Sequence, residues 1–502
     1  MSDTLSYALV NMRRSTRQVT HGVAVTSTAA FGAVVGAVTL AVYLLTLAPD
    51  LYSLDSPELT AAAYRLGIAH APGYPLYTLA GWLFSHAFPI GTVAFRLNLL
   101  SALFAAAAAL LVYAAALRLS SRPALAAAGA LMLAFSYYFW ADALAAEVYS
   151  LDAALFAGLL LAAMAWRQER TLPLAALAGL MLGLGMATRT TTLLYLPALA
   201  LFAWMSGERS PHTFAAAAGG MAAGLLFYLY LPLRSAAGVS IGPGDYATDG
   251  TLRVWDLATW SGFWRHVTAS SFQSEAFAYG PLGALREAGV FGGRLASSFL
   301  IVGVPLGIAG AARQWRADRA LFVLFAASAG AAALFFINYG AIDKEFMFLP
   351  AYVVWALWAV VGLDWAVDAL PAGAFGDARL PLAAALALPA LALAVNLPLV
   401  SLRGEHRPRN EAEAFLSGVP QGAIVYGPFL DVAPFQYLQQ VEGQRPDVAL
   451  VNSWTVDERF LVALADANVG VRPFFLTQDE PILHGRYAIV RSGTGFEVRK
   501  KG

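Results

Sequence analysis

The stretch LYSLDSPELTAAAYRLGIAHAPGYPLY, residues 51–77, follows directly after the apolar run VTSTAAFGAVVGAVTLAVYLLTL, residues 25–47. The apolar run is long enough for a membrane-spanning helix, which needs about 20 mostly apolar residues. The polar stretch behind it carries two carboxylates three residues apart, Asp55 and Glu58, around Pro57. What these carboxylates do depends on whether the chain as a whole lies in a membrane.

The composition answers that question. Of the 502 residues, 59% are hydrophobic and 13% are charged, and the mean hydropathy is +0.61, whereas an ordinary soluble domain has about 25% charged residues. The sequence therefore predicts a polytopic membrane protein. The formal net charge is zero, so nothing in the charge balance indicates a nucleic-acid partner. The chain has no cysteine, which excludes disulfides and thiolate metal sites.

Apolar runs of membrane-spanning length recur along the chain. We predict an all-α bundle of about 11 transmembrane helices, with boundaries uncertain by about two to four residues. The predicted spans are 25–47, 94–117, 124–141, 149–166, 172–187, 190–206, 213–233, 291–312, 320–338, 346–367 and 380–401.

Arginines in the short loops predict the orientation, because cytoplasmic loops are enriched in Lys and Arg. Residues 1–24 contain three arginines close to the first span, so they are predicted to form a cytoplasmic N-terminal segment. Alternation then places every other short loop inside, and each of these loops is basic. The transmembrane domain, residues 25–401, is predicted to have two long outer loops, residues 48–93 and 234–290. An odd number of spans leaves the tail, residues 402–502, outside.

The tail differs in character from the spans. Short β-rich runs such as GAIVYGP and DVALVNS alternate with helical segments such as DERFLVALADANV. This alternation predicts a small extracytoplasmic α/β domain over residues 402–502. The tail contains no glycine-rich phosphate-binding pattern, so it need not bind a nucleotide.

Asp55 and Glu58 have two compatible interpretations. They fit a capping box at a helix start, with Pro57 in the first turn. A helix N-terminus also keeps a carboxylate ionised, and an ionised carboxylate at the mouth of a bundle can act as a general base. His70 lies in the sequence HAPGYP, which predicts an ordered non-helical turn, and it either supports that turn by hydrogen bonds or carries a proton. Residues 75–88 are short for a span and are predicted to form an interfacial or re-entrant helix.

Ionisable side chains at the outer ends of the predicted spans indicate a functional site. They play no part in fixing the orientation, and in a low-dielectric environment each needs a partner. In a compact bundle they would meet in one outer cavity suited to an anionic or polar ligand. Arg189 and Lys344 are best suited to bind a phosphate, through bidentate hydrogen bonds and as a point charge, respectively. The set comprises Asp55, Glu58, Arg65, His70, Arg96, Asp142, Glu147, Arg189, Arg234, Asp343, Lys344 and Glu345.

Common patterns for nucleotide and metal binding are absent from the sequence. It has no glycine-rich loop with a lysine, no HExxH helix and no Asp-x-Asp pair. A soluble nucleotide-sugar donor, a divalent metal and other cofactors are therefore not expected.

Six motifs together resemble a known family. The motifs are DSPELTAAAYRLGIAHAPGYPLYTL, AEVYSLDA, GLGMATRTTTLLYLPAL, YLYLPLRS, WSGFWRHVTASSF and YLQQVEGQRPDVALV, in this order. The chain resembles, from about residue 30 to 455, the family of domain of unknown function 2723, the protein O-mannosyltransferases like transmembrane protein 260. Where the family usually has Gly-Asp-Ser-Gly-Glu-Leu and His-Pro-Pro-Gly-Tyr-Pro, this chain has Leu-Asp-Ser-Pro-Glu-Leu and His-Ala-Pro-Gly-Tyr-Pro.

The resemblance implies a type C glycosyltransferase fold with an active site at the outer membrane face. Such an enzyme would transfer a sugar, with mannose as the family-level expectation, from a polyprenyl phosphate to a hydroxyl of a protein, glycan or lipid, with inversion. Asp55 matches the first-loop acid that deprotonates the acceptor, and Glu58 would orient Asp55, share its role or bind a sugar hydroxyl. The expected location is a bacterial inner membrane, with the active site and the C-terminal domain periplasmic or extracellular.

The remaining site residues complete this hypothesis. We expect Arg189, Lys344, Arg96 and Arg234 to bind the donor phosphate, and His70, Glu147, Tyr74 and Glu345 to bind the sugar or acceptor. The alternative hypothesis is a transporter or flippase of an amphipathic lipid-linked substrate. It predicts charges near the middle of the bilayer and paired broken helices in two related halves, neither of which is evident in the sequence.

Overall fold

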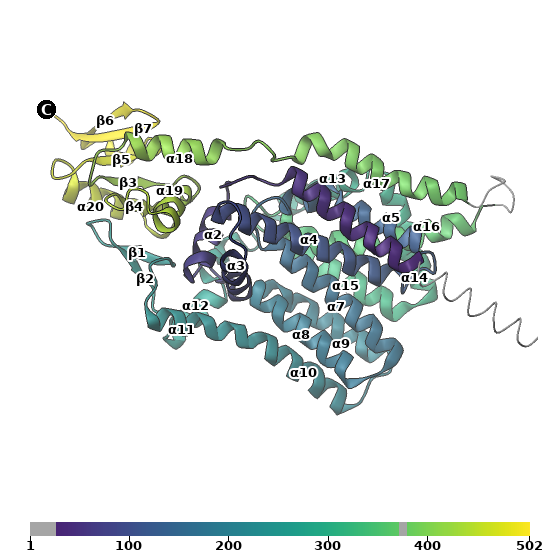
Figure 1. Cartoon of the computed structure of the whole chain (residues 1–502). Coiled ribbons are helices and arrows are strands. Elements are labelled where there is room, and N and C mark those ends of the chain that lie inside the picture. The colour runs from purple at the N-terminus through teal and green to yellow at the C-terminus, as the bar shows by residue number, and fades with distance from the viewer. Residues whose placement is uncertain (1–26, 371–378) are drawn as a thin grey trace, which may run out of the picture.

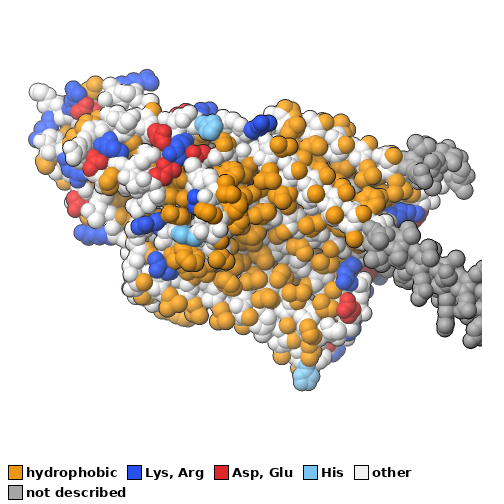
Figure 2. Space-filling view, in the orientation of Figure 1, with side chains coloured by type: hydrophobic (Ala, Val, Ile, Leu, Met, Phe, Trp, Pro, Cys, Tyr) orange, Lys and Arg blue, Asp and Glu red, His pale blue; other side chains and the backbone are white. Residues whose placement is uncertain are grey.

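The computed structural model describes residues 27–370 and 379–502. A body of long helices carries a small sheet-containing domain at one end (Figure 1). The predicted cytoplasmic segment, residues 1–24, lies outside the described residues. Apolar side chains cover most of the visible face of the helical body, while charged side chains gather on the C-terminal domain and at the opposite end (Figure 2). An apolar belt between two polar ends is the surface expected of a membrane-embedded bundle.

Seven helices in the described residues are long and apolar enough to cross a membrane. Tyr149–Glu169 (α7) lies in the centre, with 89% of its apolar window buried, whereas the first helix, Ser27–Thr46, has 17% buried and lies at the periphery. Three shorter apolar helices occupy further predicted spans, namely Pro123–Ala134 (α5), Leu172–Thr188 (α8) and Thr190–Met205 (η1 with α9). The other long helices are Val93–Ala116 (α4), Pro211–Ala237 (α10, η2 and α11), Arg319–Ile337 (α15), Phe346–Asp368 (η4 and α16) and the span Leu382–Val400 within α17, Arg379–Val400.

The predicted span 291–312 is wrong as a single straight helix. It is divided between Pro281–Ser298 (α13) and Gly303–Ala317 (α14), which meet at 101°. At the break, Leu300 and Ile301 adopt left-handed conformations with φ of 56° and 61°. The apolar composition of this region predicts an apolar environment but not the direction of the chain. The direction follows from packing, because α14 fits closely against α16 in the described residues.

The outer loops form compact structures. In the first loop, Ser56–Arg65 (α2) is followed by Pro75–Ala87 (α3), whose 13 residues are too few to span a bilayer. In the loop 234–290, an antiparallel hairpin of Gly244–Tyr246 (β1) and Leu252–Val254 (β2) precedes Trp260–Val267 (α12) and Ser270–Glu275 (η3).

The C-terminal α/β domain predicted from the sequence is present. Its five strands lie in the order β4-β3-β5-β7-β6, with β3 parallel to β4 and β5, and β7 antiparallel to β5 and β6. Helices connect the parallel strands, as parallel pairing requires. The elements are Arg407–Gly418 (α18), Ile424–Gly427 (β3), Phe429–Glu442 (α19), Ala449–Asn452 (β4), Ser453–Thr455 (η5), Glu458–Asn468 (α20), Phe474–Leu476 (β5), Pro481–Leu483 (η6), Tyr487–Ser492 (β6) and Gly495–Lys500 (β7).

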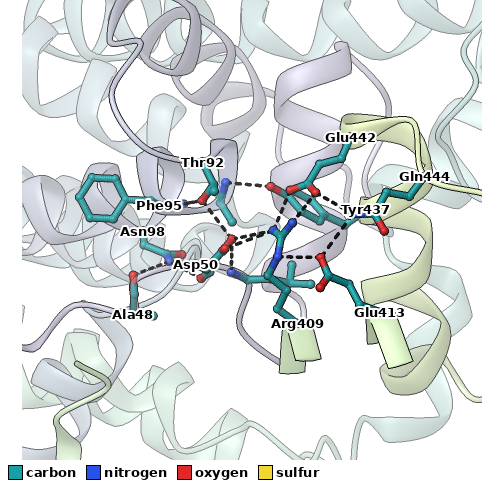
Figure 3. A network of polar contacts seen from close by, with 12 residues as sticks. Ala48, Asp50, Thr92, Phe95, Asn98, Arg409, Glu413, Tyr437, Glu442 and Gln444 are labelled. Atoms are coloured by element: carbon teal, nitrogen blue, oxygen red, sulfur yellow. Dashed lines mark hydrogen bonds and ion pairs between the residues drawn. The ribbon is translucent and has the colours of Figure 1, made fainter. Parts of the chain in front are cut away.

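A network of charges attaches this domain to the transmembrane domain. Arg409 of α18 contacts Asp50 at 3.2 Å, Glu442 at 2.6 Å and Glu413 at 3.0 Å (Figure 3). Asp50 follows the first span and also accepts a hydrogen bond from the Thr92 hydroxyl at 3.0 Å. The network therefore fixes the C-terminal domain against the first loop five residues before Asp55.

Helices α8 and α10 pack through glycines. A Cβ atom on Gly220 of α10 would lie 2.0 Å from the carbonyl oxygen of Ala176 on α8. Its neighbour Gly219 faces open space, with nothing within 4 Å. Only a residue without a side chain permits so close an approach of two helices.

We expect Gly220→Val to lower the thermal unfolding midpoint of the detergent-purified protein by several degrees. The added side chain forces α8 and α10 apart, and such overpacking costs about 1–3 kcal/mol. Tryptophan fluorescence during a temperature ramp measures the midpoint. Gly219→Val is the matched control and should shift it by less than about one degree, because its side chain meets no neighbour. Equal shifts for the two variants would contradict the close packing.

Candidate active site

Asp55 occupies the N-cap position of α2, but its side chain makes no capping hydrogen bond. Its backbone is helical, with φ −80° and ψ −12°, whereas a capping residue typically has an extended backbone. The capping-box interpretation is therefore wrong for this side chain. Pro57 does lie in the first turn, as predicted. The carboxylates of Asp55 and Glu58 both contact His70 instead.

His70 lies between these two carboxylates. Its Nδ1 is 2.5 Å from Glu58 Oε2, and its backbone N–H donates to Glu58 Oε1 at 2.8 Å. Its Nε2 is 3.6 Å from Asp55 Oδ2 and 2.9 Å from the Tyr74 hydroxyl. Glu58 thus fixes both the backbone and the ring of His70, and His70 presents its second nitrogen to Asp55.

The turn HAPGYP holds His70 in this position. Gly73 has φ +92°, and a Cβ atom there would lie 2.8 Å from Leu231 Cδ2 and 3.0 Å from His266 Nε2. Its N–H donates to the His70 carbonyl at 2.8 Å. The predicted non-helical turn is thus present, and it joins His70 to the hydroxyl of Tyr74.

The charges of this cluster depend on one another. Burial lowers the pKa of His70, but the nearby Glu58 and Asp55 carboxylates outweigh burial and raise it to about 9. Burial raises the pKa of Asp55 to about 6, against the opposing effect of His70 and with smaller contributions from Asp343 and Glu58. At neutral pH, His70 is therefore a cation and Asp55 is mostly ionised. A carboxylate with a pKa near 6 and 24% of its side chain exposed can accept a proton from a ligand.

Arg189, at the end of α8, supplies a second cation. It is 3.6 Å from Asp152 and lies over the ring of Tyr149, 4.6 Å from the centroid. The Tyr149 hydroxyl donates to Asp343 Oδ2 at 2.6 Å. These contacts hold a buried guanidinium between the start of α7 and the loop before α16.

Tyr74 and Glu147 join the two cations into one site. Tyr74 lies within electrostatic range of Asp55, Glu58, Arg189 and Asp343. Glu147 interacts with Asp55 and Asp343, and burial, followed by these charges, raises its pKa well above the usual value. Glu147 Oε2 is buried and has no hydrogen-bond partner among the described residues. A buried oxygen without a partner is a candidate ligand contact.

Lys344 and Glu345 make contacts apart from Asp55. Lys344 pairs with Glu287 of α13 at 2.8 Å and donates to the Tyr339 carbonyl at 3.1 Å. Glu345 pairs with Arg294, also on α13, at 3.4 Å. These two ion pairs form a second charged cluster beside the first, joined to it through Asp343.

The structure does not place Arg96 or Arg234 in the site. Arg96 donates to the carbonyls of Ser85 and Gly91, at 2.8 and 3.0 Å, and Arg234 donates to the Leu66 carbonyl at 2.8 Å. Both guanidiniums therefore support loop backbone, because irregular chain near the membrane leaves carbonyls that need donors.

Sequence reasoning did not select Tyr149, Asp152, Glu287 or Arg294. Tyr149 and Asp152 are three residues apart at the start of α7, so they share a helix face. Glu287 and Arg294 are seven residues apart on α13 and also share a face. The spacing could have indicated these pairs, but only once the helix starts were known.

The outer loop and the C-terminal domain enclose His70 in aromatic rings. Ring centroids of Phe272, Phe429 and Trp454 lie 5.9, 6.3 and 5.4 Å from that of His70. Beside them, a cavity of about 430 Å³ is lined by Glu58 and His70, the β1–β2 hairpin, α19 and β4. The sequence did not predict that the tail, almost 400 residues after Asp55, contributes a wall here.

No group of three or more His, Cys, Asp or Glu residues within the described ranges could hold a metal ion. The expectation that no divalent metal takes part stays a prediction.

Residues 55–212 match the family described as the protein O-mannosyl-transferase TMEM260 N-terminal domain. The mouse protein O-mannosyl-transferase TMEM260 is 34% identical over 255 residues, which are 49% of this chain and 34% of the mouse protein. The chain thus spans about a third of that relative's length. The resemblance predicted from the motifs is confirmed, and the TMEM260 match includes Asp55, Glu58, His70, Glu147 and Arg189.

Solved structures share the fold of this TMEM260-like chain. ArnT from Cupriavidus metallidurans bound to undecaprenyl phosphate gives a TM-score of 0.59 at 12% identity, covering 93% of this chain and 97% of that one. The Archaeoglobus fulgidus oligosaccharyltransferase tethered with an acceptor peptide gives 0.53 at 12% identity, covering 95% and 74%. The predicted type C glycosyltransferase fold is confirmed.

We expect the His70 resonances in NMR spectra of histidine-labelled protein to titrate with a midpoint near pH 9. Glu58→Gln should lower that midpoint by about 1–3 units, because it removes the opposite charge beside the ring. His70→Asn identifies the resonance among the seven histidines. Glu411→Gln, which neutralises an exposed carboxylate on α18, should leave the midpoint in place. A His70 midpoint that Glu58→Gln does not move would contradict the pairing.

Proposed function

We propose that this chain is an integral membrane glycosyltransferase that transfers a sugar from a polyprenyl-phosphate donor to an acceptor hydroxyl, with inversion. The family likeness favours mannose. The observation that carries the proposal is the Glu58–His70–Asp55 cluster, with Arg189 nearby, inside a region that matches the TMEM260 N-terminal domain. The ArnT structure, bound to undecaprenyl phosphate, supports the choice of a lipid-phosphate donor.

Asp55 acts as the general base in this proposal. Its carboxylate accepts the proton of the acceptor hydroxyl while the hydroxyl oxygen attacks C1 of the sugar. The bond from C1 to the phosphate oxygen breaks on the opposite face, and the lipid phosphate leaves with the bonding electron pair. A base with a pKa of about 6 is ionised at neutral pH and still basic enough to assist proton transfer.

Glu58 and His70 are positioning residues. Glu58 keeps His70 protonated, and the His70 cation stabilises the ionised form of Asp55. The 2.9 Å contact from the Tyr74 hydroxyl fixes the ring from the other side. The base is thus held in place without a capping bond that would occupy its oxygens.

Arg189 is the candidate for stabilising the leaving phosphate. Its guanidinium is held by Asp152 and the Tyr149 ring, so little reorganisation is needed as charge develops. Lys344 can contribute only by exchanging its contact with Glu287 for the phosphate. The orientation predicted from the arginines, with this site on the outer face of a bacterial inner membrane, belongs to the proposal.

The transporter hypothesis has less support. Among the described helices, one pair, α13 and α14, is broken. Transporters with inverted repeats typically have matched broken helices in both halves.

We expect Asp55→Asn to reduce sugar transfer by about 10²–10⁴-fold, the usual contribution of a general base. The assay uses purified protein in nanodiscs with radiolabelled mannosyl-phosphate polyprenol. Binding of the unreactive polyprenyl phosphate should change less than about twofold, because Asp55 faces the acceptor. Glu411→Gln is the matched control and should retain activity. Turnover near the wild-type level in Asp55→Asn would remove Asp55 as the base.

The rate of sugar transfer should fall at both low and high pH. Below about pH 6, Asp55 is protonated and the rate should fall about tenfold per unit. Above about pH 9, His70 loses its charge and its ion pair no longer holds the Asp55 carboxylate in position, so the rate should fall again. In Glu58→Gln the upper limb should move to lower pH. A flat profile between pH 5 and 7 would exclude Asp55 as the titrating base.

A further inference from the structure

The cavity beside His70 lies between two parts of the chain that the sequence keeps far apart. Glu58 and His70 line it from the first loop, while the β1–β2 hairpin and the segment Pro446–Leu450 line it from the outer loop and the C-terminal domain. Its volume of about 430 Å³ is within the range of ligand sites, about 300–1,000 Å³. Whatever occupies this cavity lies directly against the proposed catalytic cluster.

One wall of the cavity is the free edge of a sheet. Strand β4 is the first in the order β4-β3-β5-β7-β6 and pairs with β3 alone among the described strands. The Ala449 N–H donates to the Ala423 carbonyl, on the side of β3. Because successive residues of a strand direct their backbone groups to opposite sides, Leu450 and Asn452 turn theirs to the free edge. Both residues line the cavity.

The β1–β2 hairpin lies beside one end of this edge, at Asn452. The hydroxyl of Tyr246 in β1 lies near the backbone N–H of Asn452 and 3.4 Å from the side-chain amide of Gln436. The backbone N–H and C=O that Leu450 turns to the free edge have no hydrogen-bond partner among the described residues. Gln436 and Gln440 lie one turn apart on α19 and both line the cavity. Their side-chain amides can form hydrogen bonds with the backbone of a bound peptide.

We propose that an extended segment of a polypeptide acceptor pairs its backbone with the outer edge of β4 and thereby delivers a serine or threonine hydroxyl to Asp55. This inference rests on the proposed function and assigns the site that binds its acceptor. A free strand edge recognises peptide N–H and C=O groups, which sugars and lipid alcohols do not present in a matching row. Recognition through the backbone leaves the acceptor sequence largely free, apart from the hydroxyl residue.

Two contacts hold the C-terminal domain, and with it this edge, against the first loop. Arg409 ties the C-terminal domain to Asp50, five residues before the base (Figure 3). Trp454, two residues beyond the end of β4, packs against the ring of His70. An acceptor strand on β4 therefore lies beside Glu58 and His70, and the ring of His70 is 3.6 Å from Asp55.

The acceptor itself provides the sharpest test. The probe is a ten-residue peptide of β-branched and small residues with a single threonine, compared with copies N-methylated at one backbone position each. Methylation at alternate positions, those facing β4, should raise the KM about five- to tenfold, because each removes one hydrogen bond. Methylation at the positions between should change the KM less than about twofold. Equal effects at all positions would overturn the inference.

Protein variants provide an independent test. Gln436→Ala with Gln440→Ala should lower the ratio of peptide transfer to donor hydrolysis about fivefold or more. Leu450→Pro, which removes the edge N–H, should do the same, and circular dichroism shows whether this variant still folds. Gln421→Ala, an exposed amide of the same domain, is the matched control and should keep the wild-type ratio. Ratios at the wild-type level in both the double variant and a folded Leu450→Pro would overturn the inference.

Donor hydrolysis and peptide binding separate this inference from the proposed function. If the wild type hydrolyses the donor but a fluorescent copy of the peptide does not bind, or if octyl mannoside replaces the peptide as the better acceptor, the polypeptide acceptor is wrong and the glycosyltransferase stands. If the wild type consumes no donor with either acceptor or with water, the proposed function fails and the inference fails with it.

Discussion

The ion pair between Glu58 and His70 is the contact on which the rest of the site depends. Removing Asp55 from water favours its neutral form, and a neutral acid cannot accept a proton. The His70 cation opposes this effect, but burial alone would also neutralise His70, and Glu58 prevents that. Asp55 and His70, which burial alone would neutralise, therefore both keep their charge. The turn around Gly73 and the first turn of α2 hold them within contact distance.

The outer structure is built around that cluster. The first loop is joined at Asp50 to Arg409 of the C-terminal domain, and the aromatic residues Phe429 and Trp454 of the same domain cover His70. The tail is therefore part of the site rather than a separate module. In the proposed enzyme, the C-terminal domain is therefore placed to hold the acceptor beside the cluster of Glu58, His70 and Asp55.

The sequence predicted those features that depend on composition and charge, and missed those that depend on contacts. Apolar runs located the helices, and ionisable residues without a topological role identified Asp55, His70, Glu147 and Arg189, because burial forces such groups to find partners. Composition could not show the 101° break between α13 and α14, since an apolar run looks the same straight or bent. Nor could it distinguish Arg96 from Arg189, because donation to a backbone carbonyl leaves no sequence pattern.

The distribution of charge also sets the direction of the proposed reaction. Carboxylates outnumber cations around Asp55, so an anionic lipid phosphate is repelled from that side. Burial raises the pKa of Glu147 and so reduces this negative charge, yet Asp55 and Glu58 lie beside a single His70 cation. The phosphate is favoured only near Arg189 or near the Lys344 and Arg294 pairs on α13. In the proposed inverting transfer, the phosphate leaves toward these cations while Asp55 takes the proton of the acceptor hydroxyl.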